Sequence, residues 1–239
     1  MNFISSFFLK SMRFQVYSDL HLEHETNHIP QVLCDNLIIA WDVSKSNNVI
    51  ENLTKIASAY KHVIFVPGNH DYHFSTIPKM HQLFLESLPS NVHYLYPGKV
   101  VTIDTIKFVW CTLWFGNEWS FDYRLSDVDL IGETSIAALQ ELGRDHLQWL
   151  AQNVDADSVV ITHYIPSLSF IDESWHSYFK NNSFYNECID IITQQKPKAW
   201  IYGHTHTSHE TFVWPTHILC NPVWYPHEQT TYRDMYIDI

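Results

Sequence analysis

Aspartate and histidine recur where apolar runs of this chain end. The run at 37–41 is followed directly by Asp42, and other runs end in Asp19-Leu-His21, Asn69-His70-Asp71, His163 and His204-Thr-His206. A single aspartate there is usually a turn or capping residue, and a single histidine is usually an ordinary polar residue. Five such endings in one chain instead indicate a metal site, because these nitrogen and oxygen side chains bind divalent ions.

The spacing and number of these residues favour two ions over one. Asp19 and His21 are two residues apart, as are His204 and His206, so in extended backbone each pair points to one side. With one shared carboxylate, the set suits two ions about 3.5–4 Å apart, as in two-metal hydrolytic sites. No cysteine belongs to it, so we expect two divalent ions, manganese first and iron or zinc as alternatives. The seven candidate ligands are Asp19, His21, Asp42, Asn69, His163, His204 and His206.

The runs that carry these residues resemble buried β-strands. They are continuous rather than alternating and rich in β-branched and aromatic residues, which indicates strands covered on both faces: 13–18, 37–41, 62–66, 157–162 and 198–202. Helical patterns lie between them near 46–60, 76–88, 133–153 and 184–195. Short antiparallel strands are expected within 91–114 and after 207, with a last strand near 233–238. This order predicts an α/β fold of two mixed β-sheets flanked by helices.

Length and composition predict one domain over 12–239, preceded by an N-terminal extension over 1–11. The extension has a short apolar centre but no basic start or cleavage site, so a secretory signal is the less favoured alternative. The four cysteines are scattered and form no C-x-x-C pair, which is typical of a reducing compartment, and we expect a cytoplasmic protein. No apolar run approaches the roughly 20 residues of a membrane span.

The formal net charge of −12 bears on the choice of partner. Sequence-independent nucleic-acid binding depends on many Lys and Arg side chains that neutralise phosphates, so nucleic acid is not an expected partner and a nuclease is disfavoured. A small phosphorylated substrate or a phosphoprotein, gripped through bound metal, is compatible with this charge.

The motifs S-D-L-H, G-N-H-D, T-H-Y and G-H-T-H, in this order and with a strand ending in Asp42, resemble the calcineurin-like metallophosphoesterase superfamily. The resemblance extends from about Met12 to Tyr225. It implies a four-layer α/β/β/α sandwich with a dinuclear metal site bridged by Asp42. One metal would have the ligands Asp19, His21, Asp42 and His206, and the other Asp42, Asn69, His163 and His204.

The same resemblance implies a mechanism of phosphoester hydrolysis. A metal-bound hydroxide would attack phosphorus in line, and His70 would face the substrate, stabilise phosphoryl oxygens or protonate the leaving group. Asp71 would fix the tautomer of His70. The other histidines, His73 among them, are interpreted as ordinary polar residues.

Two positions depart from the family pattern. Trp41 stands where glycine usually precedes the bridging aspartate, and Trp224, in N-P-V-W-Y, replaces a second glycine, with Val223 at a usually basic position. Because side chains alternate along a strand, Trp41 is expected to turn away from the metals, to be largely buried and to narrow the mouth of the pocket.

A phosphoesterase acting on a phosphomonoester or phosphodiester is the function that the sequence favours. The alternative is a non-catalytic scaffold on the same fold, but degenerate relatives lose ligand histidines and this chain keeps them. Substrate identity does not follow from the sequence. Aromatic residues crowd two long segments at 115–132 and 164–183, where they either pack the segments down or form a stacking surface for a flat leaving group.

Overall fold

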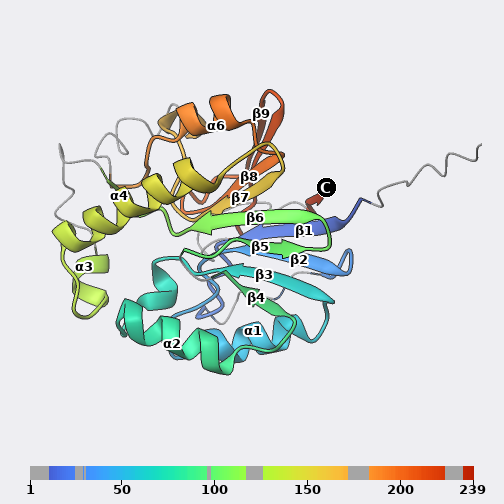
Figure 1. Ribbon diagram of the computed structural model, residues 1–239. Coiled ribbons are helices and arrows are strands. Elements are labelled where there is room, and N and C mark those ends of the chain that lie inside the picture. Colours follow the sequence, from blue (N-terminus) through green and yellow to red (C-terminus); the bar gives the residue numbers. More distant parts are fainter. Residues whose placement is uncertain are drawn as a thin grey trace, which may run out of the picture.

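The protein has four layers, with two β-sheets face to face between two layers of helices (Figure 1). The computed structural model describes residues 11–24, 29, 31–95, 98–116, 126–171, 183–223 and 234–239. Helices α1 and α2 cover the outer face of one sheet, and α4 and α6 cover the outer face of the other (Figure 1). The predicted α/β/β/α architecture is therefore confirmed.

In the first sheet, three strands are followed by candidate site residues. Its order is β11-β1-β2-β3-β4, in which β1 to β4 are parallel and β11 pairs with β1 in the antiparallel sense. The carboxyl ends of β1, β2 and β3 therefore meet at one edge. The strands are β1 (Arg13–Ser18), β2 (Asn36–Ala40), β3 (His62–Val66), β4 (Val92–Tyr94) and β11 (Tyr236–Asp238).

In the second sheet, two strands are followed by the remaining candidate site residues. Its order is β5-β6-β7-β8-β10-β9, with β6, β7, β8 and β10 parallel and antiparallel strands at both edges. The strands are β5 (Val101–Ile103), β6 (Ile106–Cys111), β7 (Ser158–Thr162), β8 (Ala199–Tyr202), β9 (His209–Val213) and β10 (Thr216–Cys220). The two sheets are joined beside the candidate site, where Ser18 N–H donates to the Asn221 carbonyl at 2.9 Å.

The helices form where their apolar residues recur at helical spacing. In α1, buried Val49, Leu53 and Ile56 form one stripe, and the N-terminus of α4 is capped by Ser135 Oγ, which accepts from Ala138 N–H. The helices are α1 (Val49–Ala57), α2 (Ile77–Ser87), α3 (Asp127–Leu130), α4 (Ile136–Asn153) and α6 (Ile189–Gln195), with short 3-10 turns at His70–Tyr72 and Leu168–Phe170. Each predicted helix is present but shorter than its apolar pattern.

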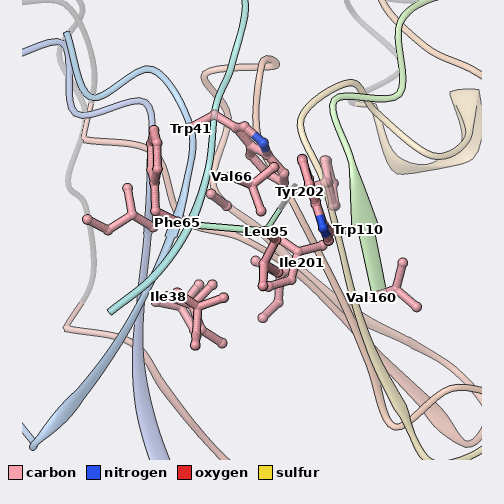
Figure 2. Packing of buried hydrophobic residues seen from close by; sticks show 14 of the residues in the cluster. Ile38, Trp41, Phe65, Val66, Leu95, Trp110, Val160, Ile201 and Tyr202 are labelled. Atoms are coloured by element: carbon pink, nitrogen blue, oxygen red, sulfur yellow. The ribbon is translucent and has the colours of Figure 1, made fainter. Parts of the chain in front are cut away.

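The core between the sheets is built from the predicted strands. Figure 2 shows Ile38, Val66, Trp110 and Ile201 in this cluster, and all four are fully buried. Strands covered on both faces explain why their sequences are continuous rather than alternating. A rigid, close-packed core of this kind fixes the strand ends that follow it.

Several predictions fall on residues that the structure does not describe. These are most of the N-terminal extension, Trp224, and the aromatic residues of the two long segments beyond Phe115 and Ile171. Within the described part of the chain, no helix is both long enough and apolar enough to span a membrane.

Candidate functional site

The seven candidate ligands predicted from the sequence lie together at the carboxyl ends of strands from both sheets. Asp19 and His21 follow β1, Asp42 follows β2 and Asn69 follows β3. The second sheet supplies His163 after β7 and the pair His204 and His206 after β8. The site is thus assembled across the junction of the two sheets.

The first group of ligand atoms comes from Asp19, His21 and His206, whose ligand atoms all lie within 4.8 Å of one another. The Nε2 atoms of His21 and His206 are 3.1 Å apart, and His206 Nε2 lies 3.9 Å from Asp19 Oδ1. Asp42 borders this group, since its Oδ2 atom is 3.9 Å from His21 Nε2.

The second group comes from Asp42, His163 and His204, again within 4.8 Å. His163 Nε2 lies 3.1 Å from His204 Nδ1 and 3.6 Å from Asp42 Oδ2. Asn69 joins this group, because its Oδ1 atom is 2.5 Å from His163 Nε2. Asp42 Oδ2 therefore lies close to a ring nitrogen of each group, and the family resemblance implies that this carboxylate bridges two metals.

The backbone at these positions is unusual. Five of the seven candidate ligands have a positive φ, namely Asp19 (50°), His21 (45°), Asp42 (47°), His204 (67°) and His206 (49°). Asp and His enter this left-handed region more readily than most residues, although the conformation still carries strain that the surrounding structure must hold. Here it is held in part by Asp19 Oδ1, which accepts from His204 N–H at 3.0 Å, and by Asp42 Oδ1, which accepts from His70 N–H at 3.0 Å.

Burial favours the neutral form of several side chains in the site. It raises the pKa of Asp42 well above the ordinary value, and the charges of Asp71 and Asp19 add to the rise. Burial likewise lowers the pKa of His21 and of His204 to about 3. These two histidines are therefore deprotonated at neutral pH, as a metal-binding histidine must be.

These residues fit divalent cations. The donor set is nitrogen and oxygen only, and buried Asp19 Oδ2 has no hydrogen-bond partner among the described residues. In the same part of the chain, no Lys or Arg forms an ion pair with Asp19 or Asp42, so nothing there compensates two buried carboxylates. A cation between the two groups would supply the compensating positive charge. Coordination to it would also replace the close contacts between ring nitrogens.

His70 lies beside these groups and is more accessible than most of them. Its side chain is 19% exposed, whereas those of His21 and His163 are fully buried. Burial lowers the pKa of His70, although a hydrogen bond with Glu23 opposes the shift. The position agrees with a side chain that faces a substrate bound at the ligand groups.

Asp71 does not contact His70 as the sequence led us to expect. Its carboxylate accepts from the backbone N–H groups of Gly68 (2.8 Å), Asp42 (3.1 Å), Val43 (3.1 Å) and Ser44 (3.2 Å). These bonds tie the loop after β3 to the segment after β2. The predicted role of Asp71 in fixing the tautomer of His70 is therefore wrong, because the loop amides occupy its oxygens.

Three residues that support the site were not predicted from the sequence. Glu23 Oε1 lies 3.3 Å from His70 Nδ1, and Asp127 Oδ1 accepts from Asn69 Nδ2 at 2.8 Å, which leaves Asn69 Oδ1 facing the second group. His73, interpreted as an ordinary polar residue, is buried and bonded to Asp127 at 2.8 Å. Glu23 follows His21 by two residues, which is a usable signal, but nothing in the pattern around Asp127 marks it.

Trp41 is fully buried, as predicted, but it does not turn away from the candidate ligands. Figure 2 shows Trp41 within the core cluster, and its ring centroid lies 5.3 Å from that of His163. Strand β2 ends at Ala40, and Trp41 (φ 84°) and Asp42 (φ 47°) are both left-handed, so strand alternation no longer applies. The predicted narrowing of the pocket mouth depends on segments outside the described residues.

Replacing Trp41 with Gly is expected to destabilise the metal-free protein. Truncating a large buried aromatic costs about 3–5 kcal/mol, whereas relief of the left-handed backbone returns roughly 1 kcal/mol. We expect a net loss of about 2–4 kcal/mol in the free energy of unfolding, measured in denaturant with a chelator present. If metal affinity and turnover instead rise together by more than tenfold, the native indole distorts the site.

Gly68 leaves room for the carboxylate of Asp42. A Cβ atom at Gly68 would lie 2.2 Å from Asp42 Oδ1 and 2.8 Å from Trp41 Cβ, closer than real contacts allow. A Cβ atom added at Gly203 would likewise lie too close to the other buried carboxylate, at 2.9 Å from Asp19 Oδ2. Glycines at these two positions are therefore required by close approach rather than by backbone conformation.

Gly68→Ala is expected to weaken metal binding by displacing Asp42. Overpacking costs about 1–3 kcal/mol, which corresponds to an affinity loss of about 5-fold to 150-fold if it falls on the bound state. Titration calorimetry with Mn²⁺ measures this loss. Gly132→Ala is the matched control, because its nearest contact is the flexible Thr76 side chain at 3.3 Å, and unchanged affinity in Gly68→Ala would contradict the steric explanation.

Comparison with known proteins identifies the family. The profile of calcineurin-like phosphoesterases (Metallophos) matches residues 12–208. The chain belongs to this family. Membership supports a phosphoesterase activity, and it agrees with the candidate metal-binding groups at the strand ends.

Individual proteins match this calcineurin-like phosphoesterase over most of its length. Uncharacterized protein L509 of Acanthamoeba polyphaga mimivirus is 25% identical, over 93% of this chain and 95% of its own length. The phosphopantetheinyl hydrolase PptH of Mycobacterium tuberculosis has a similar structure (TM-score 0.69, 17% identity, 91% of each chain). A dimetal phosphatase of Danio rerio is more distant (TM-score 0.50, 14% identity, 88% of this chain and 87% of its own). At these identities the structural matches show the shared fold.

Proposed function

We propose that this chain is a dinuclear-metal-dependent phosphoesterase that hydrolyses a phosphomonoester or a phosphodiester. The observation that carries the proposal is the position of Asp42 Oδ2, which lies 3.6 Å from His163 Nε2 in one ligand group and 3.9 Å from His21 Nε2 in the other. Asp19 and His206 complete the first group, and Asn69 and His204 complete the second. Manganese is the first candidate for both ions, with iron and zinc as alternatives.

The chain's own residues have distinct parts in this proposal. Bound at these groups, the ions would supply Lewis-acid polarisation of a phosphoryl oxygen and a nucleophilic oxygen at neutral pH. His70, at the exposed side of the ligands, would hydrogen-bond to the phosphoryl group or give a proton to the leaving oxygen. Asp71 would hold the loops after β2 and β3 together, so that His70 N–H keeps its bond to Asp42.

The substrate is proposed to be a small phosphorylated molecule or a phosphoprotein. The net charge of −12 argues against a polyanionic nucleic acid, whose binding depends on surface Lys and Arg. The phosphopantetheinyl group named for the Mycobacterium tuberculosis relative is one member of the phosphorylated small-molecule class worth including in a screen. A metabolite library assayed for released phosphate narrows this class most directly.

A non-catalytic scaffold is the alternative on the same fold. Retention of all seven candidate ligands and of His70, assembled within a few ångströms, favours the enzyme, because a scaffold has no need to keep uncompensated buried carboxylates. Metal content and hydrolysis, measured on the same protein, distinguish the two functions.

The deciding experiment combines metal analysis with turnover. The protein is reconstituted with Mn²⁺, Fe²⁺ or Zn²⁺, bound metal is counted by elemental analysis, and hydrolysis of an aryl phosphate and its diester is measured. We expect two ions per chain and metal-dependent release of the aryl alcohol from at least one ester. A maximum of one ion contradicts the dinuclear site, and two ions without turnover favour the scaffold.

A further inference from the structure

Glu23 lies in a turn directly after the first ligand pair, and its side chain is only 7% exposed. The turn is closed by His24 N–H, which donates to the His21 carbonyl at 3.1 Å, and it is anchored by Leu22 N–H, which donates to Val43 at 2.9 Å. The backbone therefore folds the Glu23 carboxylate back under the site instead of into solvent.

One oxygen of this carboxylate contacts two imidazoles with different expected roles. Glu23 Oε1 lies 3.2 Å from Nδ1 of His21, a candidate ligand, and 3.3 Å from Nδ1 of His70, the candidate proton donor. The two rings also meet edge to face, with centroids 4.7 Å apart. Since an ionised carboxylate only accepts hydrogen bonds, both Nδ1 atoms must carry the hydrogen.

We propose that Glu23 is a positioning residue that holds His21 and His70 in the same Nδ1–H tautomer through one shared oxygen. This inference rests on the proposed function for its catalytic meaning but not for its geometry. With Nδ1 protonated, His21 Nε2 presents a lone pair toward the first ligand group, where it lies 3.1 Å from His206 Nε2. For His70 the same arrangement leaves Nε2 as the ring nitrogen that faces a substrate. In the neutral ring Nε2 carries a lone pair, so it would donate a proton only in the imidazolium form, in which Nδ1–H keeps its bond to Glu23.

The geometry also assigns a coupling between the two histidines. Rotation of either ring out of the shared contact would remove a neighbour of the other, because both bonds end on the same atom. The orientation of the candidate proton donor is thus tied to that of a candidate metal ligand. Asp71 cannot substitute for Glu23 in this role, because backbone N–H groups occupy its oxygens.

The direct test is the tautomeric state of the two rings, observed by long-range ¹H–¹⁵N NMR on the metal-free full-length protein and on the Zn²⁺-loaded protein. The His70→Ala and His21→Ala variants assign the signals. We expect Nδ1–H at both histidines in the native protein. In Glu23→Ala we expect His70 to lose this preference, while Glu23→Gln, whose amide oxygen still accepts, should retain it.

Kinetics and metal binding provide the second readout. Loss of a group that orients a ligand typically costs about 10-fold to 100-fold in affinity or activity, so Glu23→Ala should lower kcat by that factor and weaken Zn²⁺ binding. Glu23→Gln should recover most of both losses. Glu51→Ala is the matched control, since the Glu51 side chain is 68% exposed on α1 and pairs only with the neighbouring Lys55 among the described residues.

Two results would overturn the inference. One is an Nε2–H tautomer at either histidine in the native protein, and the other is a Glu23→Ala spectrum identical to the native one. If Glu23→Ala does not fold, the native spectrum and the Glu23→Gln variant still decide the matter. Because the metal-free spectra do not depend on turnover, a failure of the proposed phosphoesterase function is recognised separately.

Discussion

Asp42→Asn is expected to abolish stable binding of both metal ions and to lower hydrolysis by at least about 10²–10³-fold. The carboxylate belongs to the second ligand group and borders the first, with Oδ2 3.6 Å from His163 Nε2 and 3.9 Å from His21 Nε2. In the variant, the amide oxygen can still accept from His70 N–H, which directs the amide NH₂ into the space between the groups. A donor with no charge then occupies the position where a cation needs a negatively charged acceptor, and each 1.36 kcal/mol lost at the transition state costs tenfold in rate.

Elemental analysis and titration calorimetry measure the metals, and an aryl phosphate ester measures hydrolysis. Asp157→Asn is the matched control, because the Asp157 side chain is 85% exposed and lies in the turn before β7. Two ions per chain with native affinity in Asp42→Asn would contradict the bridging role. Loss of one ion alone would assign Asp42 to a single metal.

His70→Ala is expected to keep the metals and to lose about 10²–10⁴-fold in kcat, the range for a positioned acid–base group. The substitution removes none of the predicted metal ligands. Asp42 Oδ1 can still accept the hydrogen bond from the backbone N–H of residue 70, which is 3.0 Å long in the native protein. The loss of kcat therefore measures the contribution of the imidazole side chain. His217→Ala serves as control, because that histidine lies on β10, where its ring bonds to Glu210 and stacks on Phe212, neither of which is a candidate ligand.

The identity of the leaving group separates two roles for His70. If the imidazole gives a proton to the leaving oxygen, a good aryl leaving group should make the variant nearly as fast as the native protein, while an alkyl leaving group should show the full loss. Equal losses on both substrates would instead indicate stabilisation of the phosphoryl oxygens. Native kcat on both would exclude any catalytic role for His70.

The fold and the residues that meet at the candidate site could be predicted because each rests on a strong local signal. Buried parallel strands are continuous apolar runs, and the ligands follow them directly, so a run such as Ile38 to Ala40 both forms β2 and locates Asp42. The strand ends then had to meet, because carboxyl ends of parallel strands share an edge of a sheet.

What could not be predicted depends on backbone conformation and on contacts distant in sequence. Alternation along a strand suggested the wrong direction for Trp41, because the chain leaves the strand region at that residue with φ 84°. Asp127 contacts Asn69 from 58 positions away along the chain, with no spacing to indicate it. The family resemblance assigned Asp71 as the partner of His70, yet the neighbouring amides bind Asp71, and the turn after His21 brings Glu23 to His70 instead.

The assembly of the site from both sheets has a mechanical consequence. Ions held by Asp19, His21, Asp42 and Asn69 from one sheet and by His163, His204 and His206 from the other would act as cross-links between two separately ordered layers. Near the site, the described backbone joins the layers through few hydrogen bonds, such as that from Ser18 to Asn221 at 2.9 Å. Chelation should therefore accelerate amide hydrogen exchange at the carboxyl ends of β1, β2, β7 and β8, while the outer helices α1 and α4 keep their protection.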